Sequence, residues 1–397
     1  MAQSLRDKDC EFICELITEM VHDRCFCERG SREFVEVDSI RVDPLSFPDK
    51  IPVNEIYAAE VGIRFSGELQ TFPVVIKLLP KTAEVMNALE LFQNEELFYS
   101  KIVVKIGTPN FAKCYAADMG RYGGPVIVLE NLKTQGYREL ERKLDEEHLQ
   151  VWIKALGTFH GKGLKLKSES PTEFREFHAK LLEATFNEEN RTDMPNVFLK
   201  TTPFRGLKYL KSLPQPDLEF IEKIDTRLGT NPYEITRDLA TEVSDFSTLC
   251  HGSLSRKNLL FKYDEQGKPI DVRLIDWQTT RYSPPGIDLG PIIFTNLDAD
   301  DRLSKVNRLL EVYLDAVEAE LPTVSRKDLR RDVVSKLLFA YNVASFYVPY
   351  VDKDLITLEK RATLEQFVEA VCSFGGEEAD QELALILLDL KALGTFD

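Results

Sequence analysis

The sequence predicts an α+β protein with a β-rich region first and a mainly helical region after it. Three segments rich in β-branched residues lie between positions 34 and 80, and the turn-like stretches SFPDKIP and SGEL separate them. From about residue 138 onward, apolar residues recur mostly at helical spacing. This order favours two lobes, 1–128 and 138–397, joined by a hinge at 129–137.

Each expected element has its own signal. The three strands are FVEVDSIRV, EIYAAEVGIRF and FPVVIKLLP, and VIVLENL predicts a buried strand that runs into the hinge. A hairpin is expected over Leu259–Trp277, because two apolar runs flank the polar turn DEQGKP. Helices are predicted over Asp9–Val21, over Glu84–Val103, after the capping acid Asp145, and in succession over Arg302–Leu393.

The composition excludes several classes of protein. Of 397 residues, 43% are hydrophobic, and 50 basic residues against 66 acidic ones give a formal net charge of −16. That balance argues against nucleic-acid binding, although a single nucleotide needs only one lysine and a metal ion. No apolar run approaches 18 residues, so no membrane span is expected. The seven thinly spread cysteines and the absence of a signal peptide favour a cytoplasmic location.

A lysine inside an apolar strand is the first candidate for chemistry. Lys77 lies between Ile76 and Leu78, and burying its charge is costly without an acidic partner. Glu95, which lies 18 residues later in the predicted helix, could supply that carboxylate, as in protein kinases. The alternative is an edge strand whose lysine lies in water.

The stretch HGSLSRKN, His251–Asn258, directly precedes the hairpin that ends in IDWQ. Because a hairpin returns its two ends to one place, Asn258 and Asp276 would meet and offer two oxygen ligands suited to Mg²⁺. The alternative is a turn-capping asparagine and a surface aspartate.

These motifs together resemble the ecdysteroid kinase-like (CHK kinase-like) family. LCHGSLSRKNLLFKYDEQGKPIDVRLIDWQTTRYSPPGIDL is similar to its phosphotransferase signature, usually His-Gly-Asp, four residues, Asn, a hairpin and Ile-Asp-Phe-Gln. VVIKLLPK, EELFYSKIV, VLENLKTQGY and LGTFHGKGLKLK resemble its lysine strand, glutamate helix, hinge and following helix. The resemblance, from about residue 35 to 300, implies a bilobal protein-kinase-like fold, ATP and Mg²⁺ as cofactors, and phosphoryl transfer to a small apolar hydroxyl compound such as a steroid.

The resemblance also implies roles by position. Lys77 would grip the phosphates, Glu95 would hold it, and the backbone from Glu130 to Leu132 would meet adenine. Asn258 and Asp276 would bind Mg²⁺, while His251 and Asp288 would support the catalytic loop. We interpret His160 as a packed helix histidine, since its helix is apolar.

Two departures from the family pattern bear on activity. Ser253 stands where the family has its catalytic aspartate, and a serine hydroxyl is not a base near pH 7. The stretch NEIYAAEV, interpreted as the turn that covers the phosphates, has Ala58 and Ala59 in place of glycine. Two hypotheses follow: a kinase impaired in catalysis, or a pseudokinase that binds a nucleotide, small ligand or partner without transfer.

Overall fold

The computed structural model describes residues 2–45, 55–80, 87–107, 110–186, 194–253, 255–350 and 364–397. They form two compact units, unit 1 with Met1–Arg138 and Arg273–Gln278, and unit 2 with Glu139–Val272 and Thr279–Asp397. From sequence, residues 273–278 were expected in the helical lobe with the rest of 138–397. They cluster instead with the β-rich unit, and this brings Asp276 into the same unit as Lys77.

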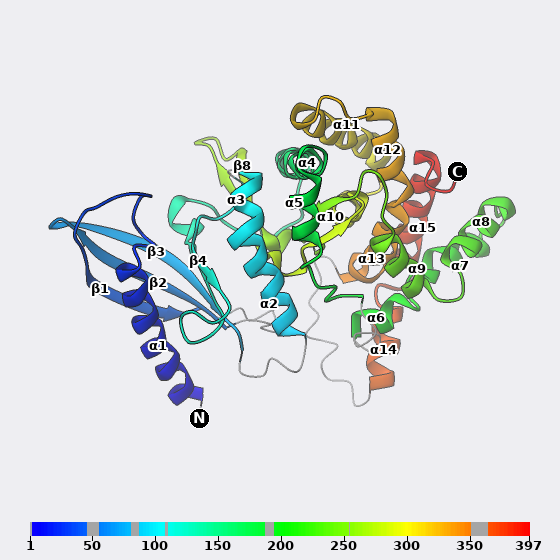
Figure 1. The fold of residues 1–397 in the computed structure, drawn as a ribbon. Helices are drawn as coiled ribbons and strands as arrows, with labels where there is room; N and C mark the ends of the chain where they lie inside the picture. The colour runs from blue at the N-terminus through cyan, green and yellow to red at the C-terminus, as the bar shows by residue number, and fades with distance from the viewer. Residues whose placement is uncertain are drawn as a thin grey trace. The chain divides into compact units, whose positions relative to one another are not determined.

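Unit 1 is built on a five-stranded antiparallel sheet with the strand order β1-β2-β3-β5-β4 (Figure 1). The strands predicted from sequence are confirmed as β1 (Val35–Pro44), β2 (Glu55–Phe65), β3 (Glu68–Leu78) and β5 (Val126–Glu130). The fifth, β4 (Cys114–Asp118), was not predicted, because CYAAD is short and weak in β-branched residues.

Helix α1 (Ala2–His22) covers one face of this sheet and extends further toward the N-terminus than the predicted Asp9–Val21. Its buried residues Ile13, Ile17 and Met20 share a core with alternate residues of β2, Tyr57 and Val61 among them. Because side chains alternate along a strand, the residues between these point to the opposite face of the sheet.

The helical segment after β3 is interrupted by a wider turn. α2 (Ala88–Leu97) passes into the π-helix η2 (Phe98–Ile102) and then into α3 (Val103–Ile106). The sequence predicted one helix over Glu84–Val103, whose first residues, 84–86, lie outside the described residues. Such π turns are frequent at functional sites, and this one directly follows the turn that carries Glu95.

Unit 2 is mainly helical and holds one small sheet and most of a second, whose strand β8 ends in two residues that cluster with unit 1. β6 (Thr248–Cys250) pairs with β9 (Arg281–Ser283), and β7 (Leu259–Tyr263) pairs with β8 (Pro269–Leu274), which confirms the hairpin. Asp145 caps α4 as predicted, because its carboxylate accepts from the backbone N–H of His148. The α-helices of the unit are α4 (Glu146–Glu169), α5 (Pro171–His178), α6 (Met194–Leu199), α7 (Phe204–Ser212), α8 (Leu218–Leu228), α9 (Pro232–Thr241), α10 (Gly286–Asn296), α11 (Arg302–Glu320), α12 (Arg326–Ser335), α13 (Leu337–Tyr347), α14 (Leu364–Ser373) and α15 (Gly376–Leu393).

The α+β fold class is therefore confirmed, with a β-sheet region followed by a mostly helical one. Short 3₁₀ turns connect several elements: η3 (Leu132–Gln135), η5 (Arg256–Asn258) and η6 (Trp277–Thr279). No helix within the described ranges is long and apolar enough to cross a membrane.

The expected phosphate-covering turn at Asn54–Val61 is wrong. Ala58 and Ala59 lie inside β2, paired with Val75 and Val74 of β3, and Asn54 lies outside the described residues. The strand EIYAAEVGIRF, which was predicted for the same residues, runs through this segment, and its Tyr57 and Ala59 pack under α1. The sequence between β1 and β2, LSFPDKIPVN, contains no glycine.

Candidate functional site

Lys77 lies in β3, in the middle of the sheet of unit 1. It is opposite Ile56 of β2 and Ile127 of β5, and it is 7% exposed, which excludes the alternative of an edge-strand lysine in water. Its Nζ lies 2.7 and 2.8 Å from the two carboxylate oxygens of Glu95, which is fully buried on α2. The structure thus brings together the lysine and glutamate that the sequence singled out.

A second carboxylate completes this ion pair. Asp276 Oδ1 lies 3.1 Å from Lys77 Nζ. Burial alone would lower the pKa of Lys77, but Glu95 and Asp276 outweigh it and raise that pKa above its ordinary value. Burial raises the pKa of Glu95, while Lys77 and the backbone N–H of Trp277 favour its ionised form. Lys77 is therefore held as a cation that faces two carboxyl groups.

Asp276 is held in an unusual backbone conformation. Its φ of 70° is in the left-handed region, which residues other than glycine rarely adopt. Gln278 Nε2 lies 3.5 Å from Asp276 Oδ2. The Asp276 side chain is 24% exposed. A carboxylate that touches Lys77 with one oxygen and keeps access to solvent is suited to hold a metal ion.

The segment around Asp276 is anchored to α2 and η2 by contacts that the sequence analysis did not anticipate. The ring of Trp277 stacks on Phe98 with centroids 3.9 Å apart and an interplanar angle of 5°, and Phe111 meets it edge-on. Asn94 donates to the carbonyl of Gln278 at 3.2 Å. The aromatic residue after Ile-Asp was visible in sequence, but its partners were not, since they lie far away along the chain.

A partly exposed apolar surface adjoins Lys77 on the same face of the sheet. Ile56 is paired with Lys77, Ala58 with Val75, and Val75 with Leu129, so these side chains share the face opposite α1. Ile56, Ala58 and Val75 are half-buried and carry no polar groups. Such a surface beside a cation suits a ligand with a flat apolar part and a charged part.

The predicted hinge residues are structured by their own hydrogen bonds. The backbone N–H of Glu130 donates to Lys113 O, and that of Asn131 donates to Pro73 O. The Glu130 carboxylate accepts from the Lys113 N–H at 2.7 Å and from Gln135 Nε2 at 2.6 Å. The Glu130 side chain is thus occupied in fixing the end of β5.

In unit 2, Asp288 supports the loop that starts at His251. Its Oδ2 accepts from the backbone N–H of His251 at 2.6 Å, and its Oδ1 accepts from that of Gly252 at 2.9 Å. His160 Nε2 lies 3.3 Å from Oδ2, and its other ring nitrogen lies 3.0 Å from the Tyr313 hydroxyl. The buried His160 is therefore a partner of Asp288 as well as a packed helix residue.

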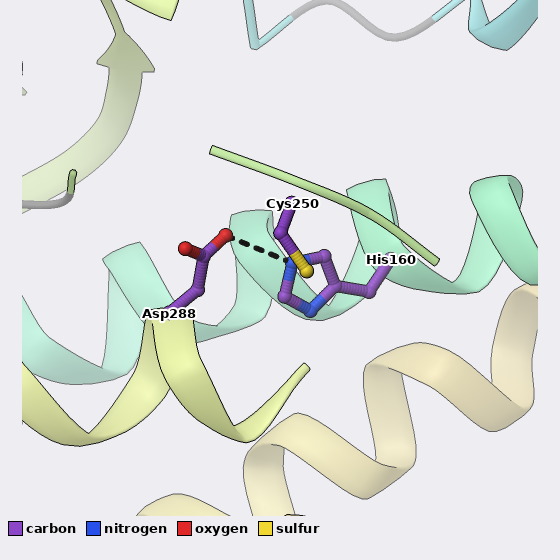
Figure 2. A group of neighbouring side chains, drawn as sticks. All are labelled: His160, Cys250 and Asp288. Carbon is purple, nitrogen blue, oxygen red and sulfur yellow. Dashed lines mark hydrogen bonds and ion pairs between the residues drawn. The ribbon is translucent and has the colours of Figure 1, made fainter. Parts of the chain in front are cut away.

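Figure 2 shows His160, Cys250 and Asp288 close together, with the His160–Asp288 contact dashed. Their ligand atoms lie within 4.8 Å of one another, as in a metal site. However, both Asp288 oxygens accept backbone N–H groups, and burial raises the pKa of the Cys250 thiol, which donates to Ser283 O. These three residues are thus better suited to support the loop than to hold a metal ion.

The electrostatics of Asp288 agree with this supporting role. Burial alone would raise the pKa of its carboxyl group, but His160, His251 and the Gly252 N–H favour the ionised form, and the pKa is lowered below its ordinary value. The carboxylate is therefore ionised over the whole physiological range.

Ser253 is exposed on this loop. Its backbone N–H donates to His251 Nδ1 at 3.4 Å, and its carbonyl accepts from Asn258 Nδ2 at 3.0 Å. The backbone of Ser253 is therefore tied to both His251 and Asn258. Asn258 belongs to unit 2 and Asp276 to unit 1, so their joint binding of Mg²⁺ stays a prediction.

Comparison with known proteins settles the family. The sequence model of the ecdysteroid kinase-like family matches residues 54–325, more than half of the chain. The chain belongs to this family. No curated protein sequence matches it. Among solved structures, a choline kinase from Cryptosporidium parvum Iowa II is similar over 89% of each chain at 14% identity, with a TM-score of 0.42, a likeness too low to support any argument.

Membership in the ecdysteroid kinase-like family makes this a small-molecule kinase-like protein. The matched range includes Lys77, Glu95, Asn258, Asp276 and Asp288. It also includes Ser253, at the position where the sequence resemblance implies a catalytic aspartate. This ecdysteroid kinase-like chain thus combines a lysine–carboxylate network with a serine at that position.

Proposed function

We propose that this protein is an ATP-dependent small-molecule kinase whose phosphoryl transfer is slowed because Ser253 replaces the general base. The observation that carries the proposal is the network in which Lys77 contacts both Glu95 and Asp276. A buried cation held by two carboxylates is costly to maintain, and phosphoryl-transfer enzymes use this arrangement to bind a triphosphate.

Several groups of unit 1 suit a nucleotide. The apolar surface of Ile56, Ala58 and Val75 would receive the adenine ring, since it adjoins Lys77 on one face of the sheet. The N–H groups of Glu130 and Asn131 are already engaged, so we expect the N–H of Leu132 to donate to adenine. Lys77 would contact phosphate oxygens.

Oxygen atoms of Asp276 and Asn258 are the ligands that we propose for Mg²⁺, which would neutralise the charge that develops on the transferred group. Asp276 Oδ2 fits this role because the contact of Lys77 is to the other oxygen, Oδ1. Asn258 donates to Ser253 through its nitrogen, which leaves its amide oxygen as a ligand.

The loss of the base sets the expected rate. General base assistance contributes about 10²–10⁴-fold, whereas positioning and electrostatics supply most of phosphoryl transfer. The Ser253 hydroxyl can still orient an acceptor hydroxyl by a hydrogen bond. Following the family resemblance, the acceptor is a small apolar hydroxyl compound, for which a steroid alcohol is the test case.

Nucleotide binding tests the proposal before any acceptor is known. Mg-ATP should raise the melting temperature of the full chain, because a ligand that binds only the native state stabilises it. Lys77→Met should abolish most of this shift. The matched control is Lys101→Met on η2, which removes an exposed lysine from the same unit. No shift in the wild type, or equal shifts in both variants, would refute the proposed site.

The second candidate function is a pseudokinase that binds a nucleotide, ligand or partner without transfer. The exposed Ser253 favours it, because no carboxylate stands at the base position of the loop. The two functions differ in ADP formation: a slow kinase forms ADP faster when its acceptor is present, and a pseudokinase does not.

A further inference from the structure

Arg281 lies beside the catalytic loop and has no role in the proposed function. It belongs to β9, where it is paired with Cys250 of β6, the residue directly before His251. It is 6% exposed, so its guanidinium group is almost completely removed from water. A buried guanidinium carries five N–H donors that need acceptors.

The contacts of Arg281 leave this group weakly satisfied. Its Nη2 lies 3.3 Å from Glu183 Oε1, and its Nε lies 3.5 Å from Thr279 O. Its Nη1 has no hydrogen-bond partner within the described part of the chain. The ring of Phe186 also lies 5.1 Å from the guanidinium carbon.

The carboxylate contacts of two other buried arginines of unit 2 can be compared with those of Arg281. Arg205 Nε lies 2.5 Å from Asp380, and Arg302 pairs with both Asp389 and Glu382. Each also leaves one nitrogen without a partner among the residues that the structure describes, but each has at least one short carboxylate contact. Within the described residues, Arg281 has no short carboxylate contact. The carboxylate at 3.3 Å, that of Glu183, also accepts from the backbone N–H groups of Thr185 and Phe186.

The backbone next to Arg281 is adapted to its close approach. Gly252 has a φ of 84°, and a Cβ on it would lie 2.2 Å from Thr279 O and 2.8 Å from Arg281 Nε. Only glycine fits this position. The guanidinium group is thus in contact with the loop one residue before Ser253.

We propose that Arg281 binds an oxyanion at the catalytic loop, beside Ser253. A planar guanidinium with a free N–H edge recognises phosphate and carboxylate oxygens, and burial strengthens the attraction. The identity of the oxyanion rests on the proposed function: it is the phosphoryl group in transfer or an acidic group of the acceptor. In either case Arg281 supplies positive charge where a base is missing.

The test measures binding of inorganic phosphate to the full chain, without nucleotide, by calorimetric titration. Arg281→Met should weaken binding about tenfold or more, since a hydrogen bond between charged groups is lost. Arg281→Lys should retain part of it. Glu183→Gln should tighten binding, because it removes the competing negative charge while keeping an oxygen for the Thr185 and Phe186 N–H groups.

Controls separate this site from the nucleotide site. Arg281→Met should weaken phosphate binding by the same factor in the wild type and in the Lys77→Met background, so the inference can fail while the proposed function stands, and the reverse. Melting temperatures of each variant show whether the fold is kept, and a destabilised Arg281→Met leaves Glu183→Gln as the deciding variant. Phosphate bound much more tightly than acetate indicates the phosphoryl group, and similar affinities indicate an acidic acceptor. No phosphate binding, or weaker binding by Glu183→Gln, overturns the inference.

Discussion

The lysine network of unit 1 and the catalytic loop of unit 2 differ in what each has kept. In unit 1, the lysine and both carboxylates are present and in contact. In unit 2, Asp288 holds the loop through two backbone N–H groups, while Ser253 stands where the family resemblance implies the base. Under the proposed function, the supports of the loop have persisted without its reactive group, because they stabilise the fold whether or not transfer occurs.

The largest expected effect comes from restoring the base. Ser253→Asp should raise ADP formation about 10²–10⁴-fold in the presence of an accepted alcohol, since a carboxylate can take the hydroxyl proton. The assay measures ADP formed from Mg-ATP with a panel of steroid and simple alcohols.

Ser255→Asp is the matched control, because it adds the same charge two residues later at another exposed serine. An equal gain in both variants would mean that added charge, and not a base, changed the rate. No gain with any alcohol would favour the pseudokinase.

A smaller effect, on stability, is expected from the loop support. Asp288→Asn replaces one carboxylate oxygen by an amide NH₂ group, which would face a backbone N–H group of His251 or Gly252. Because these donors then lack an acceptor, the free energy of unfolding should fall by about 2–5 kcal/mol. Denaturant unfolding measures this loss. The control Asp298→Asn affects an exposed residue of the same unit, whose pair with Lys143 should contribute at most about 1 kcal/mol.

Acid should act on the same group. Because the pKa of Asp288 is lowered in the folded state, its stabilisation is complete above its ordinary pKa, near 3.8, and is lost as the pH falls through the lower folded-state value. The free energy of unfolding of Asp288→Asn should therefore fall less than that of the wild type on acidification below pH 4. Parallel curves would contradict a support that depends on the ionised carboxylate.

The smallest effect should come from the aromatic anchor of unit 1. Trp277→Leu removes the stack on Phe98 and should cost about 2 kcal/mol, with weaker stabilisation by Mg-ATP because Asp276 loses its fixed backbone. Thermal unfolding with and without Mg-ATP measures both. Trp277→Phe, which keeps a ring, should lose less. If Trp277→Leu binds Mg-ATP as the wild type does, the anchor does not position Asp276.

Sequence periodicity predicted most strands and helices, and the cost of burying Lys77 pointed to Glu95. Contacts between distant segments were out of reach: Lys77 and Asp276 are 199 positions apart, and no local pattern indicates that Trp277 meets Phe98. The error at Ala58 has a different origin: the phosphate-covering turn was placed inside a segment that the same sequence correctly predicted as a strand. The weak pairing of Arg281 could not be predicted either, because it depends on contacts with segments that are distant along the chain.

The assignment of residues 273–278 to unit 1 has a consequence for the linkage between the units. The chain passes from one unit to the other at 138–139, 272–273 and 278–279, so three covalent connections join them. Lys77, Glu95 and Asp276 all belong to unit 1, whereas Ser253 and Asn258 belong to unit 2. The contacts within the lysine network are therefore internal to one unit, although the chain reaches Asp276 only after passing through most of the sequence of the other.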